Sequence, residues 1–444
     1  MTEVQTRLVD IIREAAVPLS GGGDGDYDAL LQLTKDCHFI LLGEASHGTE
    51  DFYTARAEVT KRLIMEQGLT AVAIEGDWPS VYRVNRFVRG LGSDSDAGQA
   101  LSDFRRFPLW MWRNTVFLEF VQWLRVYNFS QPETQRVGVY GLDMYSLYES
   151  IAEILSYLES VDPTAADEAR IRYGCLDNVA DEQGYGYGVH LGRVPSCEEN
   201  VIAQLESLRN RSADYLMHDG IDAQDEQFQA EQNARLVKNA EQYYRNMFSS
   251  RVSTWNMRDR HMGETLDALH RHLSARTGNK ARLAVWAHNS HLGDARATAM
   301  GDRGELNLGQ LCRERYGHDA LLVGFTTHTG SVTAASSWDG PAECKSVRPS
   351  LPGSHENLFH ETGLTRFFLS LNGALEERYR HSQLERAIGV LYLPESERTS
   401  HYFRARLADQ FDAVFHFDRS SALRPLDGVP AWEPSAPDTY PSGL

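Results

Sequence analysis

Short, continuous runs of apolar residues recur along the chain, and most of them end in a polar or acidic residue. Runs of this length are typical of β-strands buried on both faces, as in a parallel sheet covered by helices. Seven runs are predicted to be strands: 39–44, 70–77, 136–143, 283–288, 320–325, 387–392 and 413–418. Between the early runs, apolar residues recur at helical spacing, as in the stripe of Phe52, Ala55, Val59 and Leu63. This alternation predicts an α/β fold with a mainly parallel central sheet flanked by helices.

The stretch 146–280 differs from the rest because long polar-rich helical patterns dominate it, interrupted by a glycine and tyrosine loop at 184–188. We expect an inserted helical subdomain or lid there, placed over the carboxyl ends of the strands. The α/β core then consists of 1–145 and 281–422. The tail 423–444 holds several prolines and little periodicity, which predicts a segment that wraps the surface or is partly disordered.

Charge and hydropathy narrow the range of partners. The chain has 444 residues, of which 62 are acidic and 44 basic, giving a net charge of -18. This excess disfavours nucleic acid and anionic membranes as partners. No apolar stretch approaches the roughly 18 residues that a membrane span needs, and the amino terminus lacks an apolar signal core. We expect a cytoplasmic protein with a small-molecule substrate, and the sequence indicates no particular oligomeric state.

The cysteines predict neither disulfides nor a thiolate zinc site. They are odd in number, scattered and never spaced as CxxC, so we expect them to be reduced and mostly buried. The five are Cys37, Cys175, Cys197, Cys312 and Cys344.

Two histidine-bearing segments each follow a predicted buried strand. Glu44 and His47 come after the run at 39–42, and His288 and His291 come after the run at 283–286. Ligands of open parallel sheets gather at the carboxyl ends of the strands, so this placement predicts an active site. A carboxylate three residues away can orient an imidazole to take a proton from water. The alternative is a helix-capping turn whose histidine only satisfies backbone groups.

Two predicted helices carry charge toward the core. Arg56 lies about 40° from Phe52 on a helix of 100° per residue, within the apolar stripe. A buried guanidinium needs carboxylate partners, and Glu44 and Glu75 are the natural candidates. Arg258 and Asp259 likewise lie on an apolar helix face. A structural ion-pair network would explain any one of them, whereas their convergence on the strand ends favours a functional site.

Other residues near the strand ends are weaker candidates for the substrate pocket or its support. Asp77 and Asp143 each close a predicted strand, although helix capping is the better explanation for them. Trp78 could supply an apolar wall, but such aromatic residues are more often core. Three further candidates lie near predicted strand ends or loops: His328, His401 and Tyr402.

Several common catalytic motifs are absent from the sequence. No GxSxG elbow, Walker loop or GxGxxG fingerprint follows a strand, which disfavours serine hydrolase chemistry and nucleotide binding. The carboxylates and histidines at the strand ends could bind zinc, but no HExxH occurs and a buried arginine would repel a cation. We therefore predict no cofactor and favour direct activation of water over a bound divalent metal.

Four segments, in this order, resemble the motifs of the erythromycin esterase family: 43–49, 74–78, 257–262 and 286–293. The resemblance spans about 30–420 and implies an α/β core with a helical section. It also implies that His47 activates water to open a macrolide lactone without a covalent serine, with Glu44, Arg56, Glu75 and His288 around the same cleft. Segments 354–361 and 398–403 resemble the branch without assigned substrates, for which another ester or lactone in secondary metabolism is an alternative to antibiotic resistance.

The working hypothesis gives each of these residues a task. His47, oriented by Glu44 or Glu75, deprotonates water, while Arg56 and His288 polarise the carbonyl or stabilise the oxyanion. A second hypothesis uses the same base for elimination, cyclisation or acyl transfer in a biosynthetic tailoring enzyme. A third is a protein that binds a small molecule without transforming it.

Overall fold

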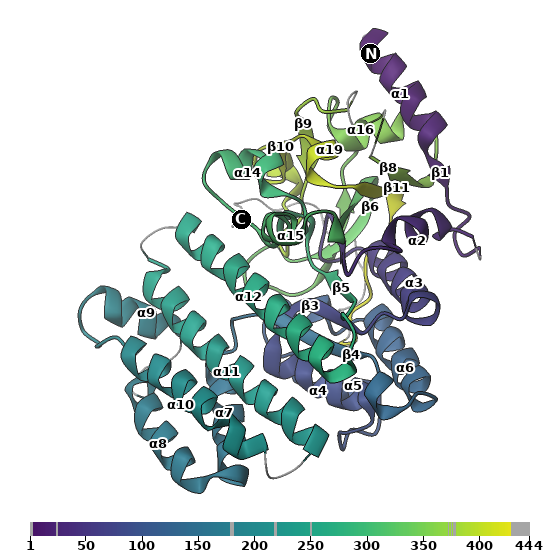
Figure 1. Cartoon of the computed structure of the whole chain (residues 1–444). Helices are drawn as coiled ribbons and strands as arrows, with labels where there is room; N and C mark the ends of the chain where they lie inside the picture. Colours follow the sequence, from purple (N-terminus) through teal and green to yellow (C-terminus); the bar gives the residue numbers. More distant parts are fainter. Residues whose placement is uncertain are drawn as a thin grey trace.

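The computed structural model describes residues 3–23, 25–177, 182–216, 220–248, 251–371, 373, 375 and 379–427 (Figure 1). Its strands are β1 (Val17–Pro18), β2 (Phe39–Leu42), β3 (Ala71–Asp77), β4 (Gly138–Asp143), β5 (Leu283–Trp286), β6 (Ala320–Ala334), β7 (Glu343–Val347), β8 (Arg366–Ser370), β9 (Gln383–Arg386), β10 (Tyr402–Ala405) and β11 (Ala413–Ser420).

The helices fall into three groups along the chain. Those before β4 are α1 (Glu3–Ala15), α2 (Asp28–Thr34), α3 (Glu50–Gln67), α4 (Trp78–Arg89), α5 (Ala97–Ala100) and α6 (Thr115–Phe129). Those between β4 and β5 are α7 (Leu147–Val161), α8 (Pro163–Tyr173), α9 (Glu182–His190), α10 (Glu198–Leu216), α11 (Gly220–Asn246) and α12 (Arg251–Thr277). Those after β5 are α13 (Asn289–Leu292), α14 (Ala299–Asp302), α15 (Leu308–Tyr316), α16 (His355–His360), α18 (Glu397–Ser400) and α19 (Leu407–Gln410).

The predicted central sheet is confirmed. Within the described residues its strand order is β1-β8-β11-β6-β2-β5-β3-β4, with β7 added beside β6. The six strands from β11 to β4 are parallel, while β1, β7 and β8 pair antiparallel. The fold is therefore α/β with a mainly parallel sheet, and the carboxyl ends of β2, β5, β3 and β4 lie next to one another.

Successive residues of the central strands face opposite layers of helices. Leu41, Ala73 and Val285 belong to one buried cluster, which includes apolar residues of α7, α11, α12 and α15. Their neighbours Ile40 and Val72 belong to a second cluster with residues of α3, α4 and α6. Because both faces are covered, the strands read as continuous apolar runs instead of alternating ones.

The predicted strand at 387–392 is wrong. The strand lies just before it, as β9, and pairs only with β10 in a separate two-stranded sheet. Ile388 instead forms an isolated bridge with Ser46. The run is apolar because Ile388, Leu391 and Tyr392 are buried as a loop, and burial alone does not distinguish a loop from a strand.

Two expectations for the region between β4 and β5 are also wrong. The glycine and tyrosine loop at 184–188 is part of α9, where glycine permits close packing: a Cβ at Gly186 would lie 2.1 Å from the Tyr244 carbonyl oxygen. Cys175 and Cys197 form a disulfide, although all five cysteines were expected to be reduced. Six helices and, among the described residues, no strand occupy this region (Figure 1). Its status as a separate insertion or lid stays a prediction.

The structure describes the first residues of the C-terminal tail, 423–427. The described part of the tail, up to Asp427, lies against the core: the Leu423 N–H donates to the Gly48 carbonyl at 2.9 Å, and Arg113 pairs with Asp427. The remainder of the expected tail, 428–444, lies outside the described residues.

None of the described helices is long and apolar enough to cross a membrane.

Candidate active site

Side chains from four neighbouring strands meet at the carboxyl edge of the sheet. Glu44 follows β2 by two residues and His288 follows β5 by two, while Glu75 and Asp143 lie near the ends of β3 and β4. Parallel strands bring such residues to one edge, as the sequence predicted. All four side chains are buried, with at most 5% of each residue exposed.

Glu44 connects His47 with Arg56. One carboxylate oxygen lies 3.0 Å from His47 Nδ1, and the other accepts a hydrogen bond from Arg56 Nη2 at 2.7 Å. With Nδ1 donating to the carboxylate, the lone pair of the imidazole is on Nε2. Among the described residues, Nε2 of His47 has no hydrogen-bond partner, and 9% of the side chain is exposed. This nitrogen is the free basic atom of the site.

Arg56 contacts Glu44 and is closed off from solvent. Its side chain is completely buried, and its guanidinium lies over the rings of Tyr53 and Trp286, 4.3 and 5.2 Å from their centroids. Within the described structure its Nε and Nη1 atoms have no hydrogen-bond partner. The expected contact with Glu44 is thus present. The expected role in polarising a carbonyl is wrong, because a bound molecule cannot reach this guanidinium.

Glu75 belongs to a second network, centred on Arg258 of α12. Arg258 Nη2 donates to Glu75 Oε1 at 2.7 Å and to Asp143 Oδ2 at 2.6 Å. The other oxygen of Glu75 accepts the backbone N–H of His288 at 2.9 Å. Burial acts to raise the pKa of Glu75, but the positive charges of His291, Arg258 and His47 outweigh it and hold the pKa well below its usual range. Glu75 is therefore a fixed anion that ties α12 to the β5 loop.

His291 extends this network to Asp259. Its Nδ1 lies 2.9 Å from Asp259 Oδ1, and its ring stacks on Trp255 with 4.5 Å between centroids. Burial acts to lower the pKa of His291, but the carboxylates of Asp259 and Glu75 raise it above the ordinary value. The two nitrogens of His291 thus lie against Asp259 on one side and against Arg258 and Glu75 on the other.

His288 is a neutral neighbour of His47. The two ring centroids are 4.8 Å apart. Burial, followed by the charge of His47, lowers the pKa of His288 to about 3. Its Nδ1 accepts the Ser290 backbone N–H at 3.2 Å, so the proton is on Nε2, which lies 3.2 Å from the Ile388 carbonyl oxygen. His288 therefore presents a neutral N–H beside the basic nitrogen.

The side chain of Asp77 does not cap the helix that follows it, and Trp78 belongs to the core. Asp77 caps no helix with its side chain; its carboxylate accepts the Tyr145 backbone N–H at 2.9 Å. Burial and the adjacent Asp143 raise the pKa of Asp77 to about 7. Trp78 is core: its indole N–H donates to Gln229 and its ring packs near Tyr140.

His401 and Tyr402 lie in a different cluster from the strand-end residues. The Tyr402 hydroxyl accepts from Arg386 Nε at 2.9 Å, and the same guanidinium pairs with Glu397 at 3.2 Å. His401 Nε2 accepts the Leu393 backbone N–H at 3.2 Å. These residues support the 387–392 loop and do not contact His47 or His288.

No sequence pattern indicated Ile388 as part of the site. Its carbonyl oxygen faces His288, and its N–H donates to the Ala45 carbonyl at 2.8 Å. A contact made by backbone atoms cannot be predicted from the type of residue, and the segment 387–392 was expected to be a strand of the central sheet. The loop at 387–392 therefore contacts both His288 and the segment that leads to His47, and no sequence motif marks it.

Most of the oxygen and nitrogen atoms at the strand ends that could bind a metal ion already have hydrogen-bond or ion-pair partners. Each oxygen of Glu44 and of Glu75 has a partner, as described above, and both nitrogens of His291 lie against charged groups. His47 Nε2 is the one free lone pair of this set within the described structure. A divalent cation would need several such ligands.

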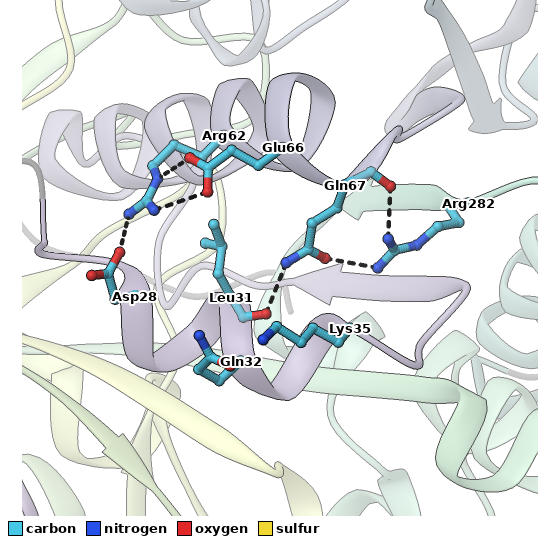
Figure 2. Close-up of a pocket in the computed structure, with 8 residues that line it drawn as sticks. All are labelled: Asp28, Leu31, Gln32, Lys35, Arg62, Glu66, Gln67 and Arg282. Atoms are coloured by element: carbon cyan, nitrogen blue, oxygen red, sulfur yellow. Dashed lines mark hydrogen bonds and ion pairs between the residues drawn. The ribbon is translucent and has the colours of Figure 1, made fainter.

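The pocket in Figure 2 lies at the other edge of the sheet. It has a volume of about 470 Å³ and includes Lys35, Gln67 and Arg282, which precede β2, β3 and β5. Arg282 is bound to backbone and side-chain oxygens of Gln67 at 2.7 and 2.9 Å. The polar groups of this pocket thus connect α2, α3 and the residue before β5, and His47 is not among the residues that line it.

Sequence comparisons identify related proteins over most of the chain. The model of the family described as erythromycin esterase matches residues 64–420. A protein of Escherichia coli described as erythromycin esterase type II is 22% identical over 435 residues, covering 94% of this chain and 98% of that protein.

Solved structures share the fold at low sequence identity. A Bacillus cereus protein is 19% identical with a TM-score of 0.79, covering 95% of this chain and 99% of its own. A succinoglycan biosynthesis protein is also 19% identical, with a TM-score of 0.76 and coverage of 96% and 99%. An erythromycin esterase mutant in its open conformation is 16% identical, with a TM-score of 0.63 and coverage of 91% and 95%.

Proposed function

This chain belongs to the erythromycin esterase family, and on that premise we propose that it hydrolyses an ester or lactone of a small molecule with water activated by His47. The observation that carries the proposal is the pair of Glu44 and His47. The carboxylate holds Nδ1 at 3.0 Å and leaves Nε2 free at the carboxyl edge of the sheet. A histidine oriented in this way is suited to act as a general base near neutral pH.

The remaining residues have supporting tasks in the proposed reaction. Water attacks the carbonyl carbon while its proton passes to His47 Nε2, and the leaving alcohol takes that proton when the C–O bond breaks. His288 donates its Nε2–H to the developing oxyanion in exchange for the Ile388 carbonyl. Arg56 holds the Glu44 carboxylate in place, and Glu75 with Arg258 fixes the loop that carries His288.

Neither a covalent serine nor a metal is part of this proposal. The Ser46 hydroxyl bonds to the Thr49 hydroxyl and not to His47. The carboxylates that could bind a cation are engaged with arginines and histidines. These contacts favour direct attack by water.

A screen of ester and lactone compounds, read by mass spectrometry, tests the proposal. Hydrolysis adds the mass of one water to the opened product. The His47→Gln variant should lose turnover, whereas Ser46→Ala and His190→Gln, the latter changing an exposed histidine of α9, should retain it. Turnover with an unchanged mass or a loss of water would assign the alternative of elimination, cyclisation or acyl transfer.

Two further outcomes would contradict the mechanism. Retained turnover in His47→Gln would move the base elsewhere, with His288 as the next candidate. Tight binding of a screened compound without any chemical change, equal in wild type and His47→Gln, would assign the binding-protein alternative.

A further inference from the structure

A second group of histidines lies on the part of the sheet that contains β6 and β11. His328 belongs to β6, His360 ends α16, and Asp418 belongs to β11. One ligand atom from each of the three lies within 4.8 Å of the others. The elements β6, α16 and β11 are together in the upper part of Figure 1, away from α7 to α12. Nothing in the proposed hydrolysis uses these side chains.

A fourth side chain points toward the same carboxylate. His416, also in β11, is completely buried, and its Nε2 has no hydrogen-bond partner in the described structure. That nitrogen lies 3.6 Å from Asp418 Oδ1, which is too long for a hydrogen bond. A buried imidazole nitrogen without a partner is costly unless something binds it.

The outer nitrogens of two of the histidines are fixed. His328 Nδ1 lies 2.6 Å from the Ser350 hydroxyl, and His416 Nδ1 lies 2.9 Å from the Thr326 hydroxyl. Such contacts orient the ring of a metal-binding histidine and leave its Nε2 as the ligand atom. His360 Nδ1 and Asp418 Oδ1 are 2.8 Å apart. A bound cation would replace that hydrogen bond.

We propose that His328, His360, His416 and Asp418 form a site for a divalent transition-metal ion of the zinc type. Imidazole nitrogens with one carboxylate are typical ligands of such ions. The rings of His328 and His360 are stacked, with 3.7 Å between centroids and 4° between planes. Because an imidazole binds a metal in the plane of its ring, the partly exposed His360 has to turn for both rings to face one ion. The nearby cation Arg386 is balanced by Glu397 at 3.2 Å and bound to the His328 carbonyl.

Bound metal would clamp α16 onto β6 and β11. The side chains of His360 and Asp418 are 42% and 24% exposed, which leaves a route for the ion from solvent. The partly exposed position of His360 also means that its replacement by glutamine leaves the core intact.

Zinc titration of the full-length protein tests the site after treatment with a chelator. Calorimetry should show one equivalent of zinc, cobalt should give visible absorption of a histidine-bound ion, and zinc should raise the melting temperature. His360→Gln and Asp418→Asn should each weaken zinc binding by at least about tenfold. His190→Gln and His47→Gln should bind zinc like the wild type. Each variant is first compared with wild type by circular dichroism without metal.

Three results would overturn the proposal. The first is no zinc binding by the wild type, which would leave a hydrogen-bonded cluster only. The second is zinc binding that survives both His360→Gln and Asp418→Asn. The third is binding that is lost in His47→Gln, which would assign the ion to the strand-end residues and would also count against the metal-free hydrolysis proposed above.

Discussion

Replacing Glu44 by glutamine separates the two tasks of this carboxylate. Glutamine keeps the shape of the side chain but removes the charge that faces Arg56 and the strong acceptor for His47 Nδ1. Both contacts are short and buried, at 2.7 and 3.0 Å. We therefore expect a loss of stability and a loss of turnover, with different origins.

The sizes of the two losses follow from the contacts. Removing one partner of a buried ion pair costs about 3–5 kcal/mol because the other charge stays buried. Arg56 is completely buried and its remaining contacts are with aromatic rings, so the full cost applies. Loss of an oriented general base lowers turnover by about 100- to 10,000-fold.

The double variant Glu44→Gln/Arg56→Met provides the matched control. It removes both charges and keeps an unbranched side chain between Tyr53 and Trp286, so most of the stability should return, while turnover should stay low. Urea denaturation gives the free energy of unfolding, and hydrolysis of the substrate found in the screen gives turnover. Recovery of turnover in the double variant, or a Glu44→Gln variant within tenfold of wild type, would refute the assigned role of Glu44.

Three other predictions follow from individual residues. Burial lowers the pKa of His355 to about 4, so the unfolded chain binds a proton below about pH 6.5 that the native state does not, and the free energy of unfolding falls between pH 6.5 and 4. His355→Gln should reduce that fall by about 1.4 kcal/mol per pH unit, measured in urea at several pH values; an unchanged slope would contradict it. Because burial and a neighbouring carboxylate raise the pKa of Asp77 to about 7, Asp77→Asn should remove an inflection near pH 7 from the pH–rate profile, and its persistence would assign it to another group. A Cβ at Gly48 would lie 1.8 Å from the Thr333 carbonyl oxygen, so Gly48→Ala should lower stability by about 1–3 kcal/mol and displace His47; Gly389→Ala, where the space is open, should melt like the wild type.

The sequence predicted the parts of the fold that depend on local pattern. Continuous apolar runs identified the strands that carry Glu44, Glu75 and His288, because burial on both faces leaves no polar position in them. The same rule failed at Ile388, where a loop is buried as deeply as a strand. Pairing between strands that are distant in the chain is not encoded in any local pattern, so the antiparallel additions to the sheet were not predicted.

The site was predicted to a similar extent and for similar reasons. Charge on an apolar helix face revealed Arg56 and Arg258, since such charge needs a buried partner. The predicted contact of Arg56 with Glu44 is present, whereas its expected contact with a substrate carbonyl does not fit its complete burial. His401 and Tyr402 were expected near the pocket because they lie near predicted strand ends or loops, but Tyr402 begins β10, which belongs to a separate two-stranded sheet.

The position of β2 has a consequence for how the protein is made. Both neighbours of this strand come late in the chain: Phe39 pairs with Leu283 on one side and Ala320 on the other. During synthesis, the apolar strand that precedes Glu44 and His47 has no sheet partner until more than half of the protein has left the ribosome. Such a strand is prone to aggregate or to bind chaperones while it waits. An amino-terminal fragment that ends before β5 therefore contains the proposed base but should neither fold around it nor show activity.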